Sequence, residues 1–416
     1  MLKALRGTKD ILPDEARLWQ YIEASSRYIF SIYGYKEIRT PVIEEASLFI
    51  RSIGNATDIV QKEMYVFTDR GGRQIALRPE ATASVVRSYI ENSIGNKEGL
   101  SKLFYIGPMF RSERPQKGRQ RQFHQLGVEA IGSDAPLLDA EIILLAGDLL
   151  KKLNIHNFKI KINSLGCKKD KEKILEDHRK AIKPHLKSLC DECNERYEKN
   201  VLRVFDCKNP ECQKIVSKID AANSLCKDCE GHFKSVKSAL DELKVAYEVD
   251  PRIVRGLDYY TKTVFEIVQE DLGAKDAICA GGRYNNLIQD MGGKSTPATG
   301  FAFGIERLIL AIKDSDVKSG PSLDAFIAIV DKDKFKQGFA LLSSLRKKGI
   351  ACDIDYEDKS LKAQMRKAEK LGARFVIIFG GDEFKKGKVA LRDMMKREQR
   401  EVELEDITKE ICDYTA

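Results

Sequence analysis

The 416-residue sequence lacks the features that mark several large classes of protein. Its eleven prolines and 43% hydrophobic content exclude collagen-like, low-complexity and mostly disordered chains. The longest apolar runs, such as Ile142–Ala146 and Leu308–Ile312, are far too short to cross a bilayer. Because the N-terminus becomes acidic before an apolar segment develops, we expect no secretory signal, no membrane association and a cytoplasmic protein.

Common motifs of nucleotide-binding proteins and hydrolases are also missing. The sequence contains no GxxxxGK[ST] phosphate loop, no GxGxxG turn after a strand, no HExxH and no GxSxG, and its five histidines are scattered. A nucleotide site in this chain must therefore be built from other groups. Arginines on an antiparallel sheet would serve, because a guanidinium group keeps its charge and pairs with two phosphate oxygens at once.

The spacing of apolar residues predicts an α+β protein built on an antiparallel sheet, since strands dominate without regular βαβ crossovers. The expected elements are helices over Asp14–Tyr33 and Pro79–Tyr89, strands over Tyr35–Val42, Leu103–Arg111, Gln122–Ile131, Tyr247–Val249, Thr263–Gln269 and Ala277–Ala280, a hairpin of Met64–Thr68 with Gln74–Leu77, and a strand or turn feeding a helix over Gly300–Ile312.

Changes in composition divide this pattern into four parts. Residues 168–246 are rich in Lys, Glu and Cys and favour helices, so they are predicted to form a helical insertion. The insertion splits a catalytic domain into residues 1–167 and 247–321, the second part including a linker. Residues 322–416 alternate as β-α-β-α-β and predict a small three-layer α/β domain with a mostly parallel sheet.

Ten cysteines are many for a chain expected in a reducing compartment, and six of them fall between Cys190 and Cys229. Two C-x-x-C pairs in this segment would supply four thiolates for a structural zinc ion. A third pair, Cys207 and Cys212, competes for the metal, and reduced cysteines in a helical subdomain are the alternative. The predicted zinc ligands are Cys190, Cys193, Cys226 and Cys229.

The net charge of +8 is modest, but basic residues are concentrated in two segments. Residues 102–121 contain six basic side chains and one acid, and residues 362–397 contain eleven basic side chains and four acids. A charge run of this kind is often only a solvated helix face. The first segment is the more informative, because it interrupts an alternating apolar pattern.

Two neighbouring predicted strands carry polar groups on one face each. Arg111 and Glu113 are two residues apart, so they point the same way, and Phe123, Gln125 and Glu129 share a face of the next strand. Each of these residues alone is typical of a core or a surface. Together, on two strands joined by a basic loop, they predict a site that grips a phosphate and stacks on a base.

At these residues the sequence resembles the class II aminoacyl-tRNA synthetases, and within that class the histidyl-tRNA synthetase family. The resemblance covers nearly the whole chain, and Ala81 stands where glycine is expected. The segments similar to the three class motifs are Gly34–Pro41, which the resemblance places at a homodimer interface, then Phe110–Glu113 with Arg121–Glu129, and Gly300–Arg307. The segments similar to the histidine signatures are Leu77–Thr82, Arg255–Tyr260 and Ala280–Tyr284.

The resemblance implies that the chain activates L-histidine with ATP and Mg²⁺ and transfers it to the 3′ end of its cognate tRNA, with no DNA partner. The implied histidine-binding residues are Glu80, Thr82, Gln125, Glu129, Arg255, Tyr259, Tyr260 and Tyr284. The implied ATP-binding residues are Arg111, Glu113, Arg119, Arg121, Phe123 and Arg307. Arg111 and Arg255 are the expected catalytic pair, gripping the α-phosphate from opposite sides.

The first half-reaction needs no general base, because the histidine carboxylate is already a nucleophile, so orientation and charge stabilisation suffice. For transfer to tRNA, a phosphate oxygen of the adenylate is the expected base. The Pro115–Gln120 loop is expected to touch the acceptor end of tRNA, the insertion to clamp the acceptor arm, and residues from 322 onward to read the anticodon.

The alternative is a catalytically inert, histidine-binding regulatory paralogue of a biosynthetic enzyme. Such proteins typically lack the C-terminal domain and parts of the second and third motifs, whereas this sequence keeps that domain together with Arg111, Glu113, Arg255 and Arg307. A synthetase for proline, threonine or glycine is disfavoured by Arg255–Tyr260.

Overall fold

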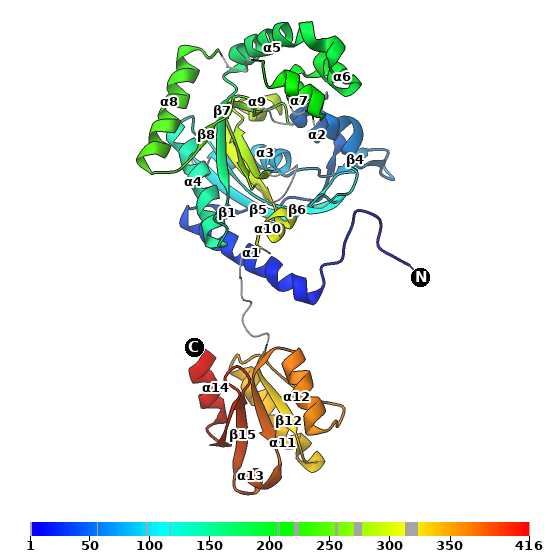
Figure 1. Ribbon diagram of the computed structural model, residues 1–416, viewed down its shortest axis with the longest axis vertical. Helices are drawn as coiled ribbons and strands as arrows, with labels where there is room; N and C mark the ends of the chain where they lie inside the picture. Colours follow the sequence, from blue (N-terminus) through cyan, green and yellow to red (C-terminus); the bar gives the residue numbers. More distant parts are fainter. Residues whose placement is uncertain are drawn as a thin grey trace. The chain divides into compact units, whose positions relative to one another are not determined.

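The computed structural model describes residues 2–55, 57–96, 99–116, 118–205, 207, 209–219, 224–253, 257–269, 277–312 and 323–415. The chain forms two compact units, Met1–Val317 and Lys318–Ala416, each with its own sheet (Figure 1). The division into four parts is finer than these two units and stays a prediction. No helix among the described residues is long and apolar enough to cross a membrane.

The N-terminal unit is built on an eight-stranded sheet in the order β1-β5-β6-β11-β10-β9-β7-β8. The outermost pairs, β1–β5 and β7–β8, are parallel, and every pair between them is antiparallel. This antiparallel centre confirms the predicted fold class. The strands are β1 (Lys36–Glu37), β5 (Ser101–Phe110), β6 (Gln122–Ile131), β7 (Lys159–Ser164), β8 (Glu248–Val249), β9 (Thr261–Val268), β10 (Ala277–Arg283) and β11 (Ala298–Gly304).

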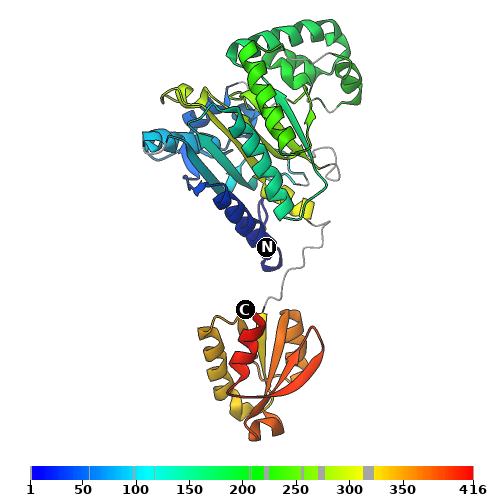
Figure 2. The ribbon, with the colours of Figure 1, turned by 90° about the vertical axis from the view of Figure 1, so that its left-hand side faces the viewer.

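The two faces of this sheet carry different cores. Leu126, Val128 and Ala130 of β6 pack into the core formed with α1, α4, α8 and α10, and Figures 1 and 2 show α4 and α8 running side by side. Ile131 packs on the opposite face with α3 and α9. Because successive strand residues point to opposite faces, Gln125 and Glu129 also lie on the α3 face. The helices are α1 (Pro13–Ile32), α3 (Thr82–Glu91), α4 (Pro136–Lys152), α8 (Lys227–Glu242), α9 (Leu287–Asp290) and α10 (Ile305–Ile312).

The predicted hairpin is confirmed, but the strand predicted over Tyr35–Val42 is wrong. Only Lys36–Glu37 pairs, with β5, because the guanidinium of Arg78 binds the carbonyl oxygens of Thr40 (3.0 Å) and Pro41 (3.4 Å) in place of a strand partner. The adjoining elements are β2 (Ile43–Glu45), α2 (Ala46–Ile53), the π-helical turn η1 (Ile59–Glu63), β3 (Val66–Thr68), β4 (Gln74–Leu77) and the 3₁₀ turn η2 (Ile94–Asn96). Strands β2, β4 and β3 form a small antiparallel sheet in that order.

The regular elements among the described residues of the predicted insertion are all helices. Its helices α5, α6 and α7 gather at one end of the N-terminal unit (Figure 1), around a small core that includes Ile182, Val201, Val204 and Val216. Helix α8 then returns along α4. The elements before α8 are α5 (Lys168–Ile182), η3 (Lys183–Ser188), α6 (Asp191–Lys199), η4 (Val201–Val204) and α7 (Pro210–Val216).

The C-terminal unit is a three-layer domain on the sheet β13-β12-β14-β15-β16. Strands β12, β13 and β14 are parallel, as predicted, and an antiparallel β15–β16 hairpin that the sequence did not predict extends the sheet. Ile327 and Ile329 pack toward α11 and α14, and Phe326 and Ala328 pack toward α12. The elements are β12 (Leu323–Ile329), η6 (Lys332–Lys334), α11 (Phe335–Lys347), β13 (Cys352–Ile354), α12 (Leu361–Lys370), β14 (Ala373–Phe379), α13 (Gly381–Lys385), β15 (Lys388–Asp393), β16 (Glu398–Glu403) and α14 (Ile407–Thr415).

A buried ionic network ties the insertion's last helix to the sheet. Arg283 of β10 is fully buried, and its Nη2 lies 2.7 Å from Asp139 of α4. Asp139 also lies 2.8 Å from Nε2 of His232 on α8. The guanidinium donates further to the carbonyl oxygens of Ser133 and Ala135. One carboxylate therefore fixes two helices and a strand at a single point.

We expect Asp139→Asn to lower the free energy of unfolding of the N-terminal unit by about 3–5 kcal/mol, because it leaves the buried guanidinium of Arg283 with only the half-exposed Asp134 as a charged partner. Urea unfolding followed by the fluorescence of Trp19, the single tryptophan, measures this unit. Lys151→Ala, which removes an exposed ion pair with Asp148 on the same helix, should cost less than about 1 kcal/mol. Equal losses in the two variants would contradict a structural role for the network.

Candidate functional site

Two buried carboxyl groups meet on the sheet face beneath α3. Glu129 of β6 accepts hydrogen bonds from the Thr82 hydroxyl (2.7 Å) and from the Tyr284 hydroxyl. Glu80 accepts from the backbone N–H groups of Thr82 (2.7 Å) and Ala83 (2.9 Å), so its side chain caps the first turn of α3. Glu80 is 3% exposed and Glu129 is 1% exposed. Thr82 therefore joins two carboxyl groups that water barely reaches.

The electrostatics of this pair favour a cationic ligand. Burial raises the pKa of Glu129 to about 8, against the lowering effect of the hydrogen bonds from Tyr284 and Thr82, and the nearby Glu80 raises it further. Burial also raises the pKa of Glu80, while its backbone hydrogen bonds and the charge of Arg111 act in the opposite direction. A positive group placed between the carboxyl groups would lower both pKa values. The site formed by these residues, called the pocket from here on, is therefore suited to an ammonium group or another donor.

Aromatic hydroxyl side chains wall the pocket. The rings of Tyr259 and Tyr260 are 4.7 Å apart, and those of Tyr259 and Tyr284 are 5.5 Å apart. Tyr105 of β5 also belongs to this wall, since it interacts with Thr82 and with the two carboxyl groups, and burial raises its pKa well above the usual value. The sequence analysis missed Tyr105. Its two-residue spacing from Leu103 on β5 indicated a shared buried face. Only the pairing of Tyr105 with Gly127 on β6, which the sequence does not give, places it beside the pocket.

Glycines on the neighbouring strands make the space for these groups. A Cβ atom at Gly300 would lie 2.0 Å from Oε2 of Glu129, and one at Gly127 would lie 2.5 Å from the hydroxyl of Tyr105. Any side chain at either position would therefore displace the groups that form the pocket.

Gln125 offers an unused acceptor on the same face. Its Oε1 atom is buried and has no hydrogen-bond partner among the described residues. Gln125 is two pleats from Glu129 along β6, so the two side chains point to the same side of the sheet. A ligand that donates to Gln125 would satisfy a buried polar atom that the protein leaves unpaired.

Arg111 stands at the end of β5, next to the carboxyl pocket. Its Nε donates to the carbonyl oxygen of Pro79 at 2.9 Å, and its guanidinium carbon lies 5.3 Å from the ring centroid of Phe123. The backbone N–H of Arg111 also donates to the carbonyl oxygen of Arg121 at 2.9 Å. One face of Phe123 is therefore covered by a cation that is anchored at the start of α3.

The remaining predicted phosphate-binding residues gather around the loop between β5 and β6, but not as free cations. Arg119 and Glu113 form an ion pair at 2.9 Å, and Nε of Arg121 lies 3.5 Å from the carbonyl oxygen of Glu113. Arg307 of α10 donates to the carbonyl oxygen of Ala277. Each of these contacts uses one of the five N–H donors of a guanidinium group, so further donors are left for ATP. Arg255, the other predicted catalytic residue, lies outside the described residues.

Glu306 is a further residue that the sequence analysis missed. Its carboxylate accepts from the backbone N–H of His124 at 2.9 Å and contacts the His124 ring at 3.1 Å, so α10 is tied to β6 near the start of that strand. An acid next to Arg307 at the start of an otherwise apolar helix was the signal. Its role is to hold the strand that carries Phe123 and Gln125.

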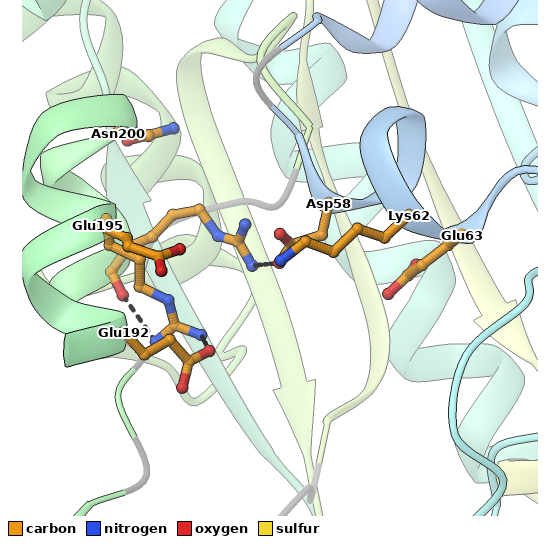
Figure 3. A pocket seen from close by; sticks show the side chains of 8 residues that line it. Asp58, Lys62, Glu63, Glu192, Glu195 and Asn200 are labelled. Atoms are coloured by element: carbon orange, nitrogen blue, oxygen red, sulfur yellow. Dashed lines mark hydrogen bonds and ion pairs between the residues drawn. The ribbon is translucent and has the colours of Figure 1, made fainter. Parts of the chain in front are cut away.

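A second, polar pocket of about 180 Å³ lies where η1 faces the insertion. Figure 3 shows Asp58, Lys62 and Glu63 on one side of it and acidic side chains of α6 on the other. Arg203 of η4 bridges the gap to Asp58 at 2.6 Å. The carbonyl oxygen of Glu63 accepts from the backbone N–H of Ser112 at 2.6 Å, so this pocket adjoins the strand end that carries Arg111.

The predicted zinc ligand set is wrong. The thiol groups of Cys190 and Cys193 cluster with those of Cys207 and Cys212, and Cys226 and Cys229 cluster with Cys167 and Asp170. The two C-x-x-C pairs stand at the starts of different helices, α6 and α8. Because α6 meets α7 while α8 meets the start of α5, the pairs end in separate clusters.

Comparison with known proteins identifies one family. A family model described as "Histidyl-tRNA synthetase" matches residues 7–308, and one described as "Anticodon binding domain" matches residues 324–413. Two relatives named "Histidine--tRNA ligase" are 49% identical over 407 residues (Desulforamulus reducens; 97% of each chain) and 48% identical over 413 residues (Halothermothrix orenii; 99% of each chain). The crystal structure of apo S. aureus histidyl-tRNA synthetase matches with a TM-score of 0.80 and 36% identity, covering 99% of this chain and 100% of that one.

We expect Glu129→Gln to flatten the dependence of stability on pH between pH 6 and 8. Glu129 is protonated in the folded protein up to a pKa of about 8 and ionised in the unfolded chain above about pH 4.3, so its stabilising contribution is complete at low pH and is lost as pH rises toward 8, by up to about 1.4 kcal/mol per pH unit. Urea unfolding followed through Trp19 measures the difference between wild type and variant.

The matched control is Glu91→Gln, which makes the same change at the exposed end of α3. Its pH profile should run parallel to that of wild type. Parallel profiles for Glu129→Gln and wild type would show that Glu129 is ionised in the folded protein.

Proposed function

The chain belongs to the histidyl-tRNA synthetase family, and on that premise we propose that it activates L-histidine with ATP to histidyl-adenylate and pyrophosphate and then transfers histidine to the 3′ end of its cognate tRNA. The observation that carries the proposal is the buried pair of Glu80 and Glu129, which lacks a full complement of positive charge and lies beside Arg111.

Histidine matches the pocket group by group. Its ammonium supplies the positive charge that Glu80 needs, and Thr82 and Gln125 supply oxygen atoms beside it. Its two ring nitrogens are then left for Glu129 and the tyrosine hydroxyl groups. Glu129 would accept from one ring N–H, and its contact with Tyr284 would hold the carboxyl group in place. The proposed histidine-binding residues are Glu80, Thr82, Gln125, Glu129, Arg255, Tyr259, Tyr260 and Tyr284.

Selectivity follows from burial. An amino acid without the imidazole would not supply the ring nitrogens to Glu129 and the tyrosine hydroxyl groups, so part of their buried hydrogen-bonding capacity would stay unused. A polar pocket rejects such a ligand far more strongly than an apolar pocket rejects a change of size. The glycines at 127 and 300 leave room for the Tyr105 hydroxyl and the Glu129 carboxyl group, which a side chain would displace.

The adenylation half relies on fixed cations. Arg111, anchored on the Pro79 carbonyl, is in place to neutralise the α-phosphate as the histidine carboxylate attacks, and adenine would stack on the face of Phe123 that Arg111 leaves uncovered. Opening of the Glu113–Arg119 pair would release Glu113 to the adenine amine and Arg119 to the outer phosphates. We assign Arg121 and Arg307 to the same phosphates of the ATP–Mg²⁺ substrate, and Arg255 to the α-phosphate opposite Arg111.

The tRNA is assigned to three parts of the chain. We propose that the C-terminal unit reads the anticodon, that residues 168–246 clamp the acceptor arm, and that the 115–120 loop meets the acceptor end. The catalytic parts are residues 1–167 and 247–321. We further propose that the enzyme works as a homodimer in the cytoplasm, with residues 34–41 at the dimer interface. The regulatory alternative is not favoured, because relatives named as ligases match over nearly the full length, C-terminal unit included.

The direct test is amino-acid-dependent ATP–pyrophosphate exchange with histidine, proline, threonine and glycine. We expect exchange with histidine alone, and we expect Arg255→His to lower it by about a hundredfold or more, because the transition state loses one of two cations. Arg252→His, the same substitution at an exposed arginine paired with Asp250, should leave exchange near the wild-type rate. Histidine binding without any exchange would favour the regulatory paralogue, and a normal rate for Arg255→His would refute its catalytic role.

Removal of residues 322–416 separates the two half-reactions. The truncated chain should keep histidine-dependent exchange within about tenfold of wild type while aminoacylation of tRNA falls by about a hundredfold or more, since only the second reaction needs anticodon contacts. Trp19 fluorescence controls for folding of the remaining unit. Equal losses of both activities would contradict this division of labour.

A further inference from the structure

The insertion holds two clusters of metal-binding groups that the adenylation site does not use. In the first, the sulfur atoms of Cys190, Cys193, Cys207 and Cys212 lie within 4.8 Å of one another. In the second, the thiol groups of Cys167, Cys226 and Cys229 and a carboxylate oxygen of Asp170 do the same. None of the ten cysteines forms a disulfide.

The spacing in the first cluster suits a single tetrahedral ion. The sulfur atoms of Cys190 and Cys207 are 3.8 Å apart. Four sulfur atoms arranged tetrahedrally at about 2.3 Å from zinc lie about 3.8 Å from one another, whereas a disulfide needs about 2.05 Å.

Backbone groups around the first cluster are arranged to stabilise thiolates. The N–H of Cys190 donates to the sulfur of Cys212 (3.3 Å), and the N–H of Asn209 donates to the sulfur of Cys207 (3.5 Å). Hydrogen bonds of this kind orient metal ligands and hold their negative charge. Cys193, Cys207 and Cys212 are each no more than 2% exposed and belong to the insertion's own core, in which three of nine buried residues are cysteines. Such a small core needs a further restraint to be stable.

The second cluster joins the start of the insertion to the start of its last helix, α8. Cys167 is the N-cap of α5 and Cys226 is the N-cap of α8, and Asp170 and Cys229 each follow three residues later. The two oxygens of Asp170 accept from the N–H groups of Cys226 (3.1 Å) and Cys167 (3.3 Å), so the carboxylate already joins both helix starts. Three thiol groups and one carboxylate make a donor set that zinc accepts.

We propose that the insertion binds two structural zinc ions, one held by Cys190, Cys193, Cys207 and Cys212 and the other by Cys167, Asp170, Cys226 and Cys229. Both sites have four protein ligands and no open position, so they stabilise the fold and take no part in the reaction. The inference does not depend on which amino acid the chain activates.

The two ions would fix the insertion against the histidine-signature segment. Lys171, on the turn that follows Cys167, donates from Nζ to the carbonyl oxygen of Asp258 at 2.7 Å. Asn200, at the end of α6, donates to the Asp258 side chain at 3.3 Å. Asp258 immediately precedes Tyr259. Each metal ion would therefore stabilise a helix that contacts the residue next to the tyrosine side chains of the pocket.

Metal analysis of the full-length protein, purified without chelators, tests the proposal. We expect about two zinc ions per wild-type chain and about one in each of Cys193→Ser and Cys229→Ser, because each variant removes a buried ligand of one site. Cys412→Ser, a cysteine in the C-terminal unit outside both clusters, should keep about two.

Alkylation of the wild-type protein covers the case in which the variants fail to fold. Cys226 is exposed, so as a free thiol it should react quickly, whereas a zinc-bound Cys226 should react only after a strong chelator is added. Rapid labelling of Cys226 without chelator overturns the second site. So does a result in which Cys193→Ser loses zinc and Cys229→Ser does not. Iron in place of zinc, disulfides within the first cluster, or a protein free of metal overturns the first.

Discussion

The burial of two carboxyl groups with too little positive charge around them is the constraint on which the rest of the N-terminal unit depends. Glu80 and Glu129 can stay buried only because Thr82, Tyr284 and the first turn of α3 donate to them. These donors come from two distant stretches of the chain, the start of α3 and the residue that follows β10. The antiparallel sheet, the turn into α3 and the signature strand β10 must therefore all be in place before the pocket exists.

The same unit also contains a buried carboxylate with the opposite character. Asp139 is compensated by Arg283 and contacted by His232, and its pKa stays below the usual value despite complete burial. The charge of Asp139 is balanced by partners within the protein, and this carboxylate serves the fold. Burial raises the pKa of Glu129 to about 8, and hydroxyl groups rather than a cation contact its carboxyl group. The contrast agrees with the proposal that Asp139 serves the fold and Glu129 serves a ligand, because strongly perturbed pKa values cluster at functional sites.

Patterns with a fixed period could be predicted from the sequence, and patterns that depend on packing could not. The two-residue period placed Gln125 and Glu129 on one face, as the structure does. The zinc ligands were assigned by pairing the C-x-x-C motifs with each other, but which helix starts meet is decided by tertiary packing, so Cys190 meets Cys207 and not Cys226. Tertiary packing also explains why β1 is short, because Arg78 donates to carbonyl oxygens that a longer strand would pair with a neighbouring strand.

The insertion and the pocket are connected through backbone atoms as well as side chains. The N–H of Leu165, at the end of β7, donates to the carbonyl oxygen of Lys262, and the N–H of Lys262 donates back to the carbonyl oxygen of Gly166. Cys167 is the N-cap of α5, and Tyr259 and Tyr260 directly precede β9, so these two hydrogen bonds join the start of the insertion to the start of β9. A rotation of α5 about this junction would move Lys171 and, through the Asp258 carbonyl, the tyrosine wall. A rigid cluster at the start of α5 is therefore placed where a small change of angle would otherwise reach the buried carboxyl pair.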